Sequence, residues 1–278
     1  MRRNVVVLGS RGQIGLPLAE FLDQCGYDIT EIDLDIDVSH DLRRPSPFLR
    51  ERFANADFVF FLAYDVGGSR YLRTYQNTKQ FLDSNVLIMT TVFNYLQEFE
   101  IPFIFASSQM SNMSFSAYGS LKTLGEHYTR ALGGVFVKFW NVYGYESNKN
   151  KAHVITDFID SAMKTGTIQM MTDGHERREF LHVDDCKRAL RILMENYKSL
   201  DILEGYDITS FHSASIYEVA EIVSSLTGAI IKPGESADDV QHNSLNIPRK
   251  TILSLWRPEI SLLEGIQDVI KHSRNLSD

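Results

Sequence analysis

The stretch NVVVLGSRGQIG, residues 4–15, joins an apolar β-strand pattern to a loop with three glycines. Gly9, Gly12 and Gly15 have the spacing G-x-x-G-x-x-G, and a helical pattern follows over 13–25. A strand, a glycine turn and a helix N-terminus in this order present backbone N–H groups and a favourable dipole to a pyrophosphate. Gly9 permits the tight turn, Gly12 a close approach of the ligand, and Gly15 close packing of helix on strand. The stretch therefore predicts a dinucleotide site, although a glycine-rich turn without a ligand is the alternative for the motif alone.

An acidic residue ends the second predicted strand, which covers 28–33. Asp33 stands where a carboxylate would accept hydrogen bonds from the hydroxyls of the adenosine ribose. The same charge repels the 2′-phosphate of NADP, so the sequence favours NAD. Asp35 and Asp37 follow closely and are alternatives for this role.

Three further apolar runs, at 58–63, 102–107 and 134–139, have the composition of strands that are buried on both faces. Helical patterns separate them at 69–98 and 116–132. The alternation of strands and helices is typical of βαβ units and a parallel sheet. The predicted fold class is therefore α/β, with a Rossmann-type parallel sheet flanked by helices.

After residue 140 the pattern becomes less regular and predicts a smaller C-terminal lobe. We expect this lobe to be built on the end of the sheet, without a hydrophobic core of its own. The expected division assigns 1–140, with returning segments near 175–205, to an NAD-binding domain, and 141–278 mainly to the smaller lobe. The predicted elements of the second half are helices over 153–164, 184–196, 215–227 and 261–273 and a strand over 168–171.

Charge and composition exclude some classes of partner. The chain has 278 residues and a formal net charge of −8, which disfavours non-specific binding to nucleic acids and to anionic membranes. The apolar runs are too short to span a membrane and the N-terminal stretch lacks a signal peptide pattern, so we expect a cytoplasmic protein. Cys25 and Cys186 fall in helical patterns and are expected to be buried free thiols rather than a disulfide. No metal site is expected, because metal-ligand spacing is missing among His127, His153, His175 and His212.

The stretch FSAYGSLKTLGEHY, residues 115–128, places Tyr118 four positions before Lys122 on a predicted helix. Residues i and i+4 lie on one face of a helix, so the phenol and the ammonium are expected to be neighbours. A nearby cation favours the phenolate, which would make Tyr118 a usable proton acceptor closer to neutral pH than a free phenol. Taken alone, the pair is better explained by a half-buried tyrosine beside a solvated lysine.

From Val5 to about Ile270, these motifs in this order resemble the extended short-chain dehydrogenases/reductases of the NAD-dependent epimerase/dehydratase family. Members of that family act on nucleotide sugars. The resemblance rests on the glycine loop, on the Tyr-x-x-x-Lys pair and on several further segments. These segments are FLAYDVGG (61–68), SNVLIMTTVFNYL (84–96), FIFASS (103–108), KFWNVYG (138–144), DGHERREFLHVDD (173–185) and WRPEISLLEGIQDVI (256–270).

The resemblance implies roles for individual residues. Tyr118, Lys122 and Ser108 match the catalytic residues of the family, and Lys122 would also hydrogen-bond the nicotinamide ribose. Arg178 matches the arginine that holds the substrate diphosphate, with Arg177 as a second candidate. The implied substrate-binding residues are Asn141, Arg178, Ser107 and Ser108. The implied cofactor-binding residues, with Asp41 and Leu42 near the adenine, are Gly9, Arg11, Gly12, Gln13, Ile14, Gly15, Asp33, Asp41, Leu42, Leu62, Ala63, Tyr118 and Lys122.

The chain departs from the family pattern near the catalytic residues. The segment between Ser108 and Tyr118 is shorter than usual, so Ser107 and Ser111 are alternatives for the catalytic serine. The two residues after Ser108 are glutamine and methionine. Dehydratases of the family carry an Asp-Glu pair there and decarboxylases usually a Glu, so the sequence argues against both chemistries.

A third departure lies near the C-terminus. The segment SADDV (236–240) stands where the family normally supplies a second diphosphate-binding arginine. Ser236 cannot fill that role. Arg249 and Lys250 are the alternatives, unless the substrate itself differs.

The reaction implied is epimerisation of a nucleotide-diphosphate sugar, most often at C4, by transient oxidation with NAD as cofactor. The nearest alternative is a reductase of a 4-keto nucleotide sugar with an exchangeable cofactor. Asp33 argues mildly against that alternative, because many such reductases prefer NADP. A dehydratase is less favoured, and so is a non-catalytic dinucleotide sensor, since both Tyr118 and Lys122 are present.

Members of the family commonly pair through two helices from each subunit. The corresponding helices are expected here over 85–98 and 116–131, so the resemblance implies a homodimer. Some apolar residues of these helices must also face the sheet. The candidate interface residues are Val86, Met89, Val92 and Phe93.

Overall fold

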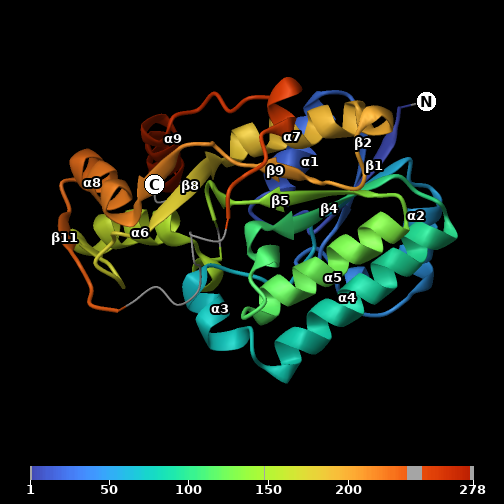
Figure 1. Ribbon diagram of the computed structural model, residues 1–278, viewed down its shortest axis with the longest axis horizontal. Helices are drawn as coiled ribbons and strands as arrows, with labels where there is room; N and C mark the ends of the chain where they lie inside the picture. The colour runs from blue at the N-terminus through green and yellow to red at the C-terminus, as the bar shows by residue number, and fades with distance from the viewer. Residues whose placement is uncertain (1, 147, 237–245, 276–278) are drawn as a thin grey trace.

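A six-stranded parallel sheet forms the centre of the molecule, in the order β2-β1-β3-β4-β5-β9 (Figure 1). The computed structural model describes residues 2–146, 148–236 and 246–275. Helices cover both faces of the sheet, which confirms the predicted Rossmann-type fold class. The strands are β1 (Asn4–Leu8), β2 (Asp28–Ile32), β3 (Phe58–Phe61), β4 (Phe103–Ser108), β5 (Val135–Phe139) and β9 (Tyr206–Ile208).

Two hydrophobic clusters, one on each face of the sheet, explain the continuous apolar runs of the strands. Val5 and Val7 of β1 belong to one cluster, whereas Val6 and Leu8 belong to the other. The strand β3 alternates in the same way. The first cluster is covered by α1 (Gly15–Gln24) and α7 (Val183–Glu195), and the second by α2 (Pro47–Ala54), α4 (Lys79–Glu98) and α5 (Ala117–Ala131).

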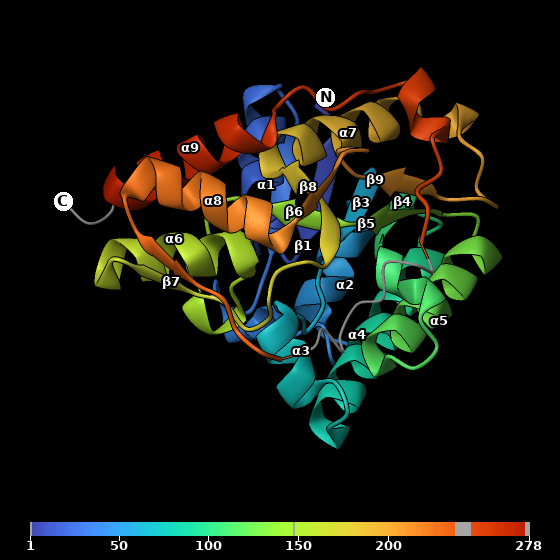
Figure 2. The same cartoon turned by 60° about the vertical axis from the view of Figure 1, so that its left-hand side comes forward.

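A third hydrophobic cluster lies beyond the end of the sheet, where three helices pack together (Figure 2). Its fully buried members include Ile159, Val223 and Ile266, one from each helix. Each helix is amphipathic, and the three apolar faces meet. The expectation that the smaller lobe lacks a core is therefore wrong, while the residue boundary between the two parts stays a prediction. The three helices are α6 (Val154–Thr165), α8 (Ile216–Thr227) and α9 (Leu262–Asn275).

Five short strands form two further small sheets. Two of them form a parallel pair, β7 (Thr167–Gln169) and β11 (Ile230–Lys232). Three others form a small mixed sheet, β6 (Asn141–Tyr143), β8 (Arg177–His182) and β10 (Ser213–Ser215). Short 3₁₀ helices occur at η1 (Val38–His40), η2 (Gln109–Asn112), η3 (Lys149–Lys151), η4 (Tyr197–Ser199) and η6 (Thr251–Ser254).

The helical pattern over 69–98 forms two helices, α3 (Ser69–Tyr75) and α4, instead of one. Thr78 separates them, because its side chain accepts the backbone N–H of Phe81 and caps α4. The helix α2 was not predicted, although the residue before it, Ser46, caps it and its first residue is proline.

The two cysteines differ in burial. Both are free, but Cys186 is buried and Cys25 is exposed. The expected burial of Cys25 is wrong, because this residue caps the C-terminus of α1 and lies beyond the buried part of that helix. In the described ranges, no helix is both long enough and apolar enough to cross a membrane.

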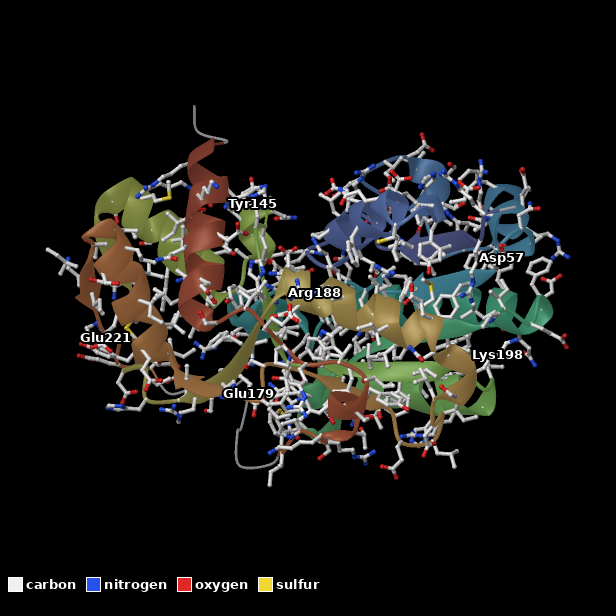
Figure 3. The ribbon with its side chains drawn as sticks, turned by 90° about the horizontal axis from the view of Figure 1, so that it is seen from above. Asp57, Tyr145, Glu179, Arg188, Lys198 and Glu221 are labelled. Carbon is white, nitrogen blue, oxygen red and sulfur yellow. The ribbon has the colours of Figure 1, made fainter. Side chains whose placement is uncertain are left out.

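Asp185 on α7 attaches the segment before α9 to the helices that cover the sheet. Its side chain is fully buried and accepts the backbone N–H groups of Glu259, at 3.0 Å, and of Ile260, at 2.8 Å. Arg188 also hydrogen-bonds this carboxylate and lies between the sheet and the smaller lobe (Figure 3). The buried charge is therefore compensated by Arg188 on the same helix and by the two backbone donors of this segment.

We expect Asp185→Ala to lower the free energy of unfolding by about 3 kcal/mol, because two backbone donors and Arg188 lose their acceptor. Urea unfolding followed by circular dichroism measures this loss. Asp184→Ala is the matched control, since the neighbouring side chain is 38% exposed and its ion pair with Lys187 is worth about 1 kcal/mol at most. Equal losses in the two variants would contradict the role assigned to Asp185.

Candidate active site

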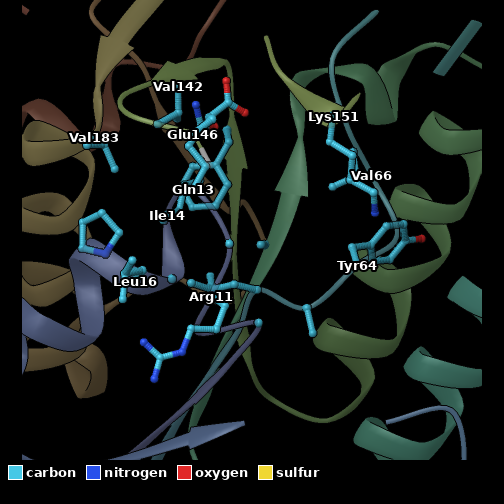
Figure 4. Close-up of a pocket in the computed structure, with 18 of the residues that line it drawn as sticks. Arg11, Gln13, Ile14, Leu16, Tyr64, Val66, Val142, Glu146, Lys151 and Val183 are labelled. Carbon is cyan, nitrogen blue, oxygen red and sulfur yellow. The ribbon is translucent and has the colours of Figure 1, made fainter. Parts of the chain in front are cut away.

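A cavity of about 840 Å³ opens at the carboxyl ends of the parallel strands (Figure 4). One wall is formed by the glycine loop and the ends of β2 and β3, and another by the loop after β6 together with α9. Open α/β sheets bind ligands at this edge, and pockets of roughly 300–1,000 Å³ are typical of small-molecule sites. All the residues predicted to bind the cofactor line this cavity, and so do Ser107 and Ser108.

At Gly9 and Gly15, the glycine loop leaves no room for a side chain. Gly9 has a φ of +80°, and a Cβ atom there would lie 2.9 Å from the backbone of Ala63. A Cβ atom at Gly15 would lie 2.0 Å from the carbonyl oxygen of Gly9. The helix α1 begins without a side-chain cap, so its first N–H groups can bind an anion. Gln13 Nε2 is buried beside the cavity and has no hydrogen-bond partner within the described chain, so the loop fits a dinucleotide.

The carboxylate of Asp33 stabilises the conformation of the loops at the end of β2. It accepts the backbone N–H of Arg11 at 2.9 Å and that of Asp35 at 3.0 Å. Asp35 also lines the cavity. The side chain of Asp37 instead caps η1 by accepting the N–H of Ser39 at 2.8 Å. Asp33 is therefore better placed than Asp37 for the ribose, and its oxygens can accept further hydrogen bonds.

Tyr118 and Lys122 lie one turn apart on α5, and both are buried at the cavity. The helix starts at Ser116, whose side chain accepts the backbone N–H of Gly119. The ammonium of Lys122 donates a hydrogen bond of 2.7 Å to the carbonyl oxygen of Ala106 on β4. The two residues therefore meet at the strand end where Ser107 and Ser108 also lie.

Burial governs the ionisation of this pair. It raises the pKa of Tyr118 to about 12, and the hydrogen bond with Ser108 opposes that rise only in part. Burial also lowers the pKa of Lys122, against the opposing charge of Glu126. The Lys122 ammonium lies 5.6 Å from the centroid of the Tyr118 ring but 3.5 Å from that of Tyr64. In this structure Tyr118 therefore keeps its proton at neutral pH, and the expected lowering of its pKa by Lys122 stays a prediction.

The three candidate serines have different surroundings. Ser107 Oγ donates a 2.5 Å hydrogen bond to the buried carboxylate of Glu126. Ser108 bonds the side chain of Tyr118. Ser111 is buried but does not line the cavity, and its Oγ has no partner among the described residues. Of the three, Ser108 is the one that the structure brings to Tyr118.

Two of the predicted substrate residues do not line this cavity. Of the residues that the structure describes, neither Asn141 nor Arg178 is part of its lining. Arg178 on β8 donates a 2.8 Å hydrogen bond to the carbonyl oxygen of Arg177, and burial lowers the pKa of Arg178 to about 10. Asn141 Nδ2 donates to the carbonyl oxygen of Glu179 at 3.4 Å. Their predicted contact with a diphosphate stays a prediction.

The candidates for a second diphosphate-binding residue do not line the cavity either. Arg249 bonds the carboxylate of Glu204 at 2.5 Å, just before the edge strand β9. Ser236 forms a bridge with Thr172, and the rest of SADDV, 237–240, lies outside the described residues. Neither Arg249 nor Lys250 is part of the lining of the cavity, and their role as substitutes for the second arginine stays a prediction.

Sequence reasoning missed the wall formed by the loop after β6. There, Glu146 Oε1 lies 2.7 Å from Nδ1 of His153, and Lys151 Nζ donates a 2.8 Å hydrogen bond to Asp65 from the opposite wall. Burial alone would lower the pKa of His153, but the bond to Glu146 outweighs it and raises that pKa. The one available signal was a cluster of polar residues directly after KFWNVYG. Glu146 and His153 do not form part of a metal site, because in the described ranges no group of three or more His, Cys, Asp or Glu residues could hold a metal ion.

Comparison with known proteins agrees with this geometry. Residues 5–208 match the model of the NAD dependent epimerase/dehydratase family. A putative UDP-glucose 4-epimerase of Methanocaldococcus jannaschii is 24% identical over 98% of both chains. Among solved structures, a UDP-glucose 4-epimerase from Thermotoga maritima has a TM-score of 0.80 at 19% identity and covers 99% of this chain and 100% of its own. A GDP-6-OMe-4-keto-L-xylo-heptose reductase from C. jejuni has a TM-score of 0.82 at 18% identity and covers 100% of this chain and 99% of its own. At these identities the structural likeness shows a shared fold.

Because the serines have different partners, we expect their substitution by alanine to lower the free energy of unfolding by different amounts. Ser107→Ala should lower the free energy of unfolding by about 1–3 kcal/mol, because buried Glu126 loses a hydrogen bond. Ser111→Ala should change it by less than about 0.5 kcal/mol, because its hydroxyl has no partner in the described chain. Thermal and urea unfolding compare the two variants. A loss at Ser111 as large as that at Ser107 would contradict the hydrogen-bond assignment.

Proposed function

The chain belongs to the NAD-dependent epimerase/dehydratase family, and on this basis we propose that it is a nucleotide-sugar epimerase that acts by transient oxidation of the sugar, at C4. The observation that carries the proposal is the contact of Ser108 with Tyr118 in a cavity whose other end is the glycine loop. One cavity would thus combine a dinucleotide site with a site where a substrate hydroxyl can exchange its proton. Its substrate class is a nucleotide-diphosphate sugar.

The residues that would hold NAD are those of the glycine loop, Asp33, and the apolar residues Leu42, Leu62 and Ala63, which all line the cavity. Bound NAD supplies a reversible hydride acceptor. The α1 N-terminus would face the pyrophosphate, and Asp33 would accept from the ribose hydroxyls. The negative charge of Asp33 favours NAD over NADP.

Tyr118 would take the proton of the sugar hydroxyl, while Ser108 donates a hydrogen bond to the same oxygen. With a pKa of about 12 in this structure, Tyr118 holds its proton at neutral pH. Proton transfer therefore requires a cation that stabilises the phenolate, and Lys122 is the cation on the same face of α5. Re-reduction of the 4-ketone on its other face would invert that carbon.

Three other functions agree less well with the site. A 4-keto nucleotide-sugar reductase would use the same Tyr118 and Lys122. The main argument against it is Asp33, because many such reductases prefer NADP and this carboxylate favours NAD. A dehydratase would need acidic residues that this site lacks. Gln109 occupies the position after Ser108, and its side chain accepts a 2.9 Å hydrogen bond from Asn246. A non-catalytic dinucleotide sensor would not need both Tyr118 and Lys122. The expected cytoplasmic location stays a prediction.

Tyr118→Phe should lower turnover of a UDP-hexose by about 10²–10⁴-fold and leave NAD binding almost unchanged, because only the proton acceptor is removed. Native mass spectrometry reads the bound cofactor, and NMR of the sugar reads epimerisation without added NAD. Tyr217→Phe is the control, since Tyr217 lies on α8 and outside the cavity lining. Retained activity in Tyr118→Phe would overturn the assignment, whereas turnover that requires added reduced cofactor would favour the reductase.

We also propose that the protein is a homodimer that pairs through the outer faces of α4 and α5, which lie side by side (Figure 1). Three of the expected interface residues are unsuitable, because Met89, Val92 and Phe93 are at most 2% exposed and pack inside one subunit. Val86 remains at the surface. The exposed apolar residues on these two helices are Val86, Leu87, Leu124 and Tyr128.

Leu124→Asp should convert a dimer into a monomer at micromolar concentration. In a C2 dimer the same surface of both subunits forms the interface, so each substitution places two charged side chains in it. Analytical ultracentrifugation measures the mass. Ile230→Asp is the control, because Ile230 is 66% exposed on β11, away from both helices. A monomeric wild-type protein, or equal effects of both substitutions, would contradict this interface.

A further inference from the structure

The ammonium form of Lys122 lies in a place where charges are costly, because burial lowers the pKa of this residue. The residue is 3% exposed, so its side chain is almost completely removed from water. Its ammonium has three N–H donors, and one of them bonds the carbonyl oxygen of Ala106. Within the described chain, no carboxylate lies at ion-pair distance from this ammonium. A buried ammonium without further partners would lose its proton or turn towards solvent.

An aromatic ring provides the missing partner. Lys122 Nζ lies 3.5 Å from the ring centroid of Tyr64, compared with 5.1 Å for Phe105 and 5.6 Å for Tyr118. A cation over the face of a ring is attracted by the quadrupole of the ring, and the attraction is strongest where water is excluded. Tyr64 follows Ala63 at the end of β3 and forms part of the cavity wall (Figure 4).

Lys122 contacts the ring of Tyr64 and not its hydroxyl. That hydroxyl makes a weak 3.9 Å contact with Met89 Sδ in the core. The ring of Tyr64 also meets the ring of Tyr118 edge to face, with centroids 5.9 Å apart. Tyr64 is therefore packed between the core and the two catalytic candidates, and its orientation is set from both sides.

The other charged and titratable groups around Lys122 are already engaged. Glu126, one turn further along α5, is bonded by Ser107 and lies 3.4 Å from Lys138 of β5. Arg130 approaches the same carboxylate at 3.7 Å. Asp65, next to Tyr64, bonds Tyr71 and Lys151. Tyr118 faces Lys122 with its proton retained. None of these groups replaces the ring of Tyr64 as the close partner of the ammonium.

We propose that Tyr64 is a positioning residue whose aromatic ring, rather than its hydroxyl, holds the charged ammonium of Lys122 at the cavity. This inference deepens the proposed function and rests on it for the role of Lys122. The ring keeps the cation within reach of Tyr118 and of the cofactor site before any ligand binds. A ring at position 64 is thus a requirement of the site that the Tyr-x-x-x-Lys pattern does not include.

The test compares Tyr64→Phe, which keeps the ring, with Tyr64→Leu, which removes it. The ring favours the charged form of Lys122, so its loss lowers the pKa of Lys122 and the ammonium is lost at lower pH. In Tyr64→Leu, the alkaline limit of turnover should move about one pH unit lower. The limit of Tyr64→Phe should stay at the wild-type position.

A second readout does not depend on turnover. Calorimetric titration of NAD from neutral to alkaline pH should show the same shift in Tyr64→Leu, because Lys122 is expected to contact the nicotinamide ribose. Lys122→Met should abolish this pH dependence and so assign it to Lys122. If no sugar is turned over by any form, the proposed function fails while the NAD titration still decides the role of Tyr64.

Two results would overturn the inference. An equal shift in Tyr64→Phe would assign the effect to the hydroxyl, and an unshifted limit in folded Tyr64→Leu would leave the ring without a role in positioning. If Tyr64→Leu does not fold, Tyr64→Met replaces it, because methionine fills irregular space without an aromatic face. Circular dichroism confirms that each variant is folded before the titrations are compared.

Discussion

A parallel sheet must be covered on both faces, and this requirement organises the whole chain. The N-terminal half supplies α2, α4 and α5 for one face but only α1 for the other. The second helix of that other face, α7, comes after the first strands and helix of the smaller lobe. The chain must therefore leave the sheet, begin the lobe and return. Asp185 lies on this returning helix and attaches the last segment of the lobe to it.

The central sheet was predictable because burial on both faces makes each of its main strands a continuous apolar run. The sixth strand, β9, and the strands of the lobe have three to six residues, and only β7 was predicted, over 168–171, because the others carry no periodic signal of their own. The break between α3 and α4 depends on one capping threonine inside a continuous helical pattern. The core of the lobe was missed because each of its helices could be predicted alone, whereas their mutual packing is a tertiary property.

The site was predictable where chemistry is tied to a strand end. The glycine loop and Asp33 follow from such positions, the pair on α5 follows from its helical spacing, and all of them line one cavity. The ionisation of Tyr118 was not predictable, since desolvation depends on everything packed around the phenol. The same is true of Glu146 and Lys151, whose loop has no regular pattern. The choice among three nearby serines required knowledge of their partners, which lie on α5 and are fixed by the packing of that helix on β4.

The late position of α7 has a consequence for the protein during synthesis. Val5, Phe60 and Val137 all belong to the hydrophobic cluster that α1 and α7 share. When the strands of the first 139 residues have left the ribosome, α7 is still missing, and much of this cluster is open to water. A nascent chain of that length exposes an apolar surface of the kind that chaperones bind and that promotes aggregation. Completion of the sheet therefore has to wait for a segment that is translated after the beginning of the lobe.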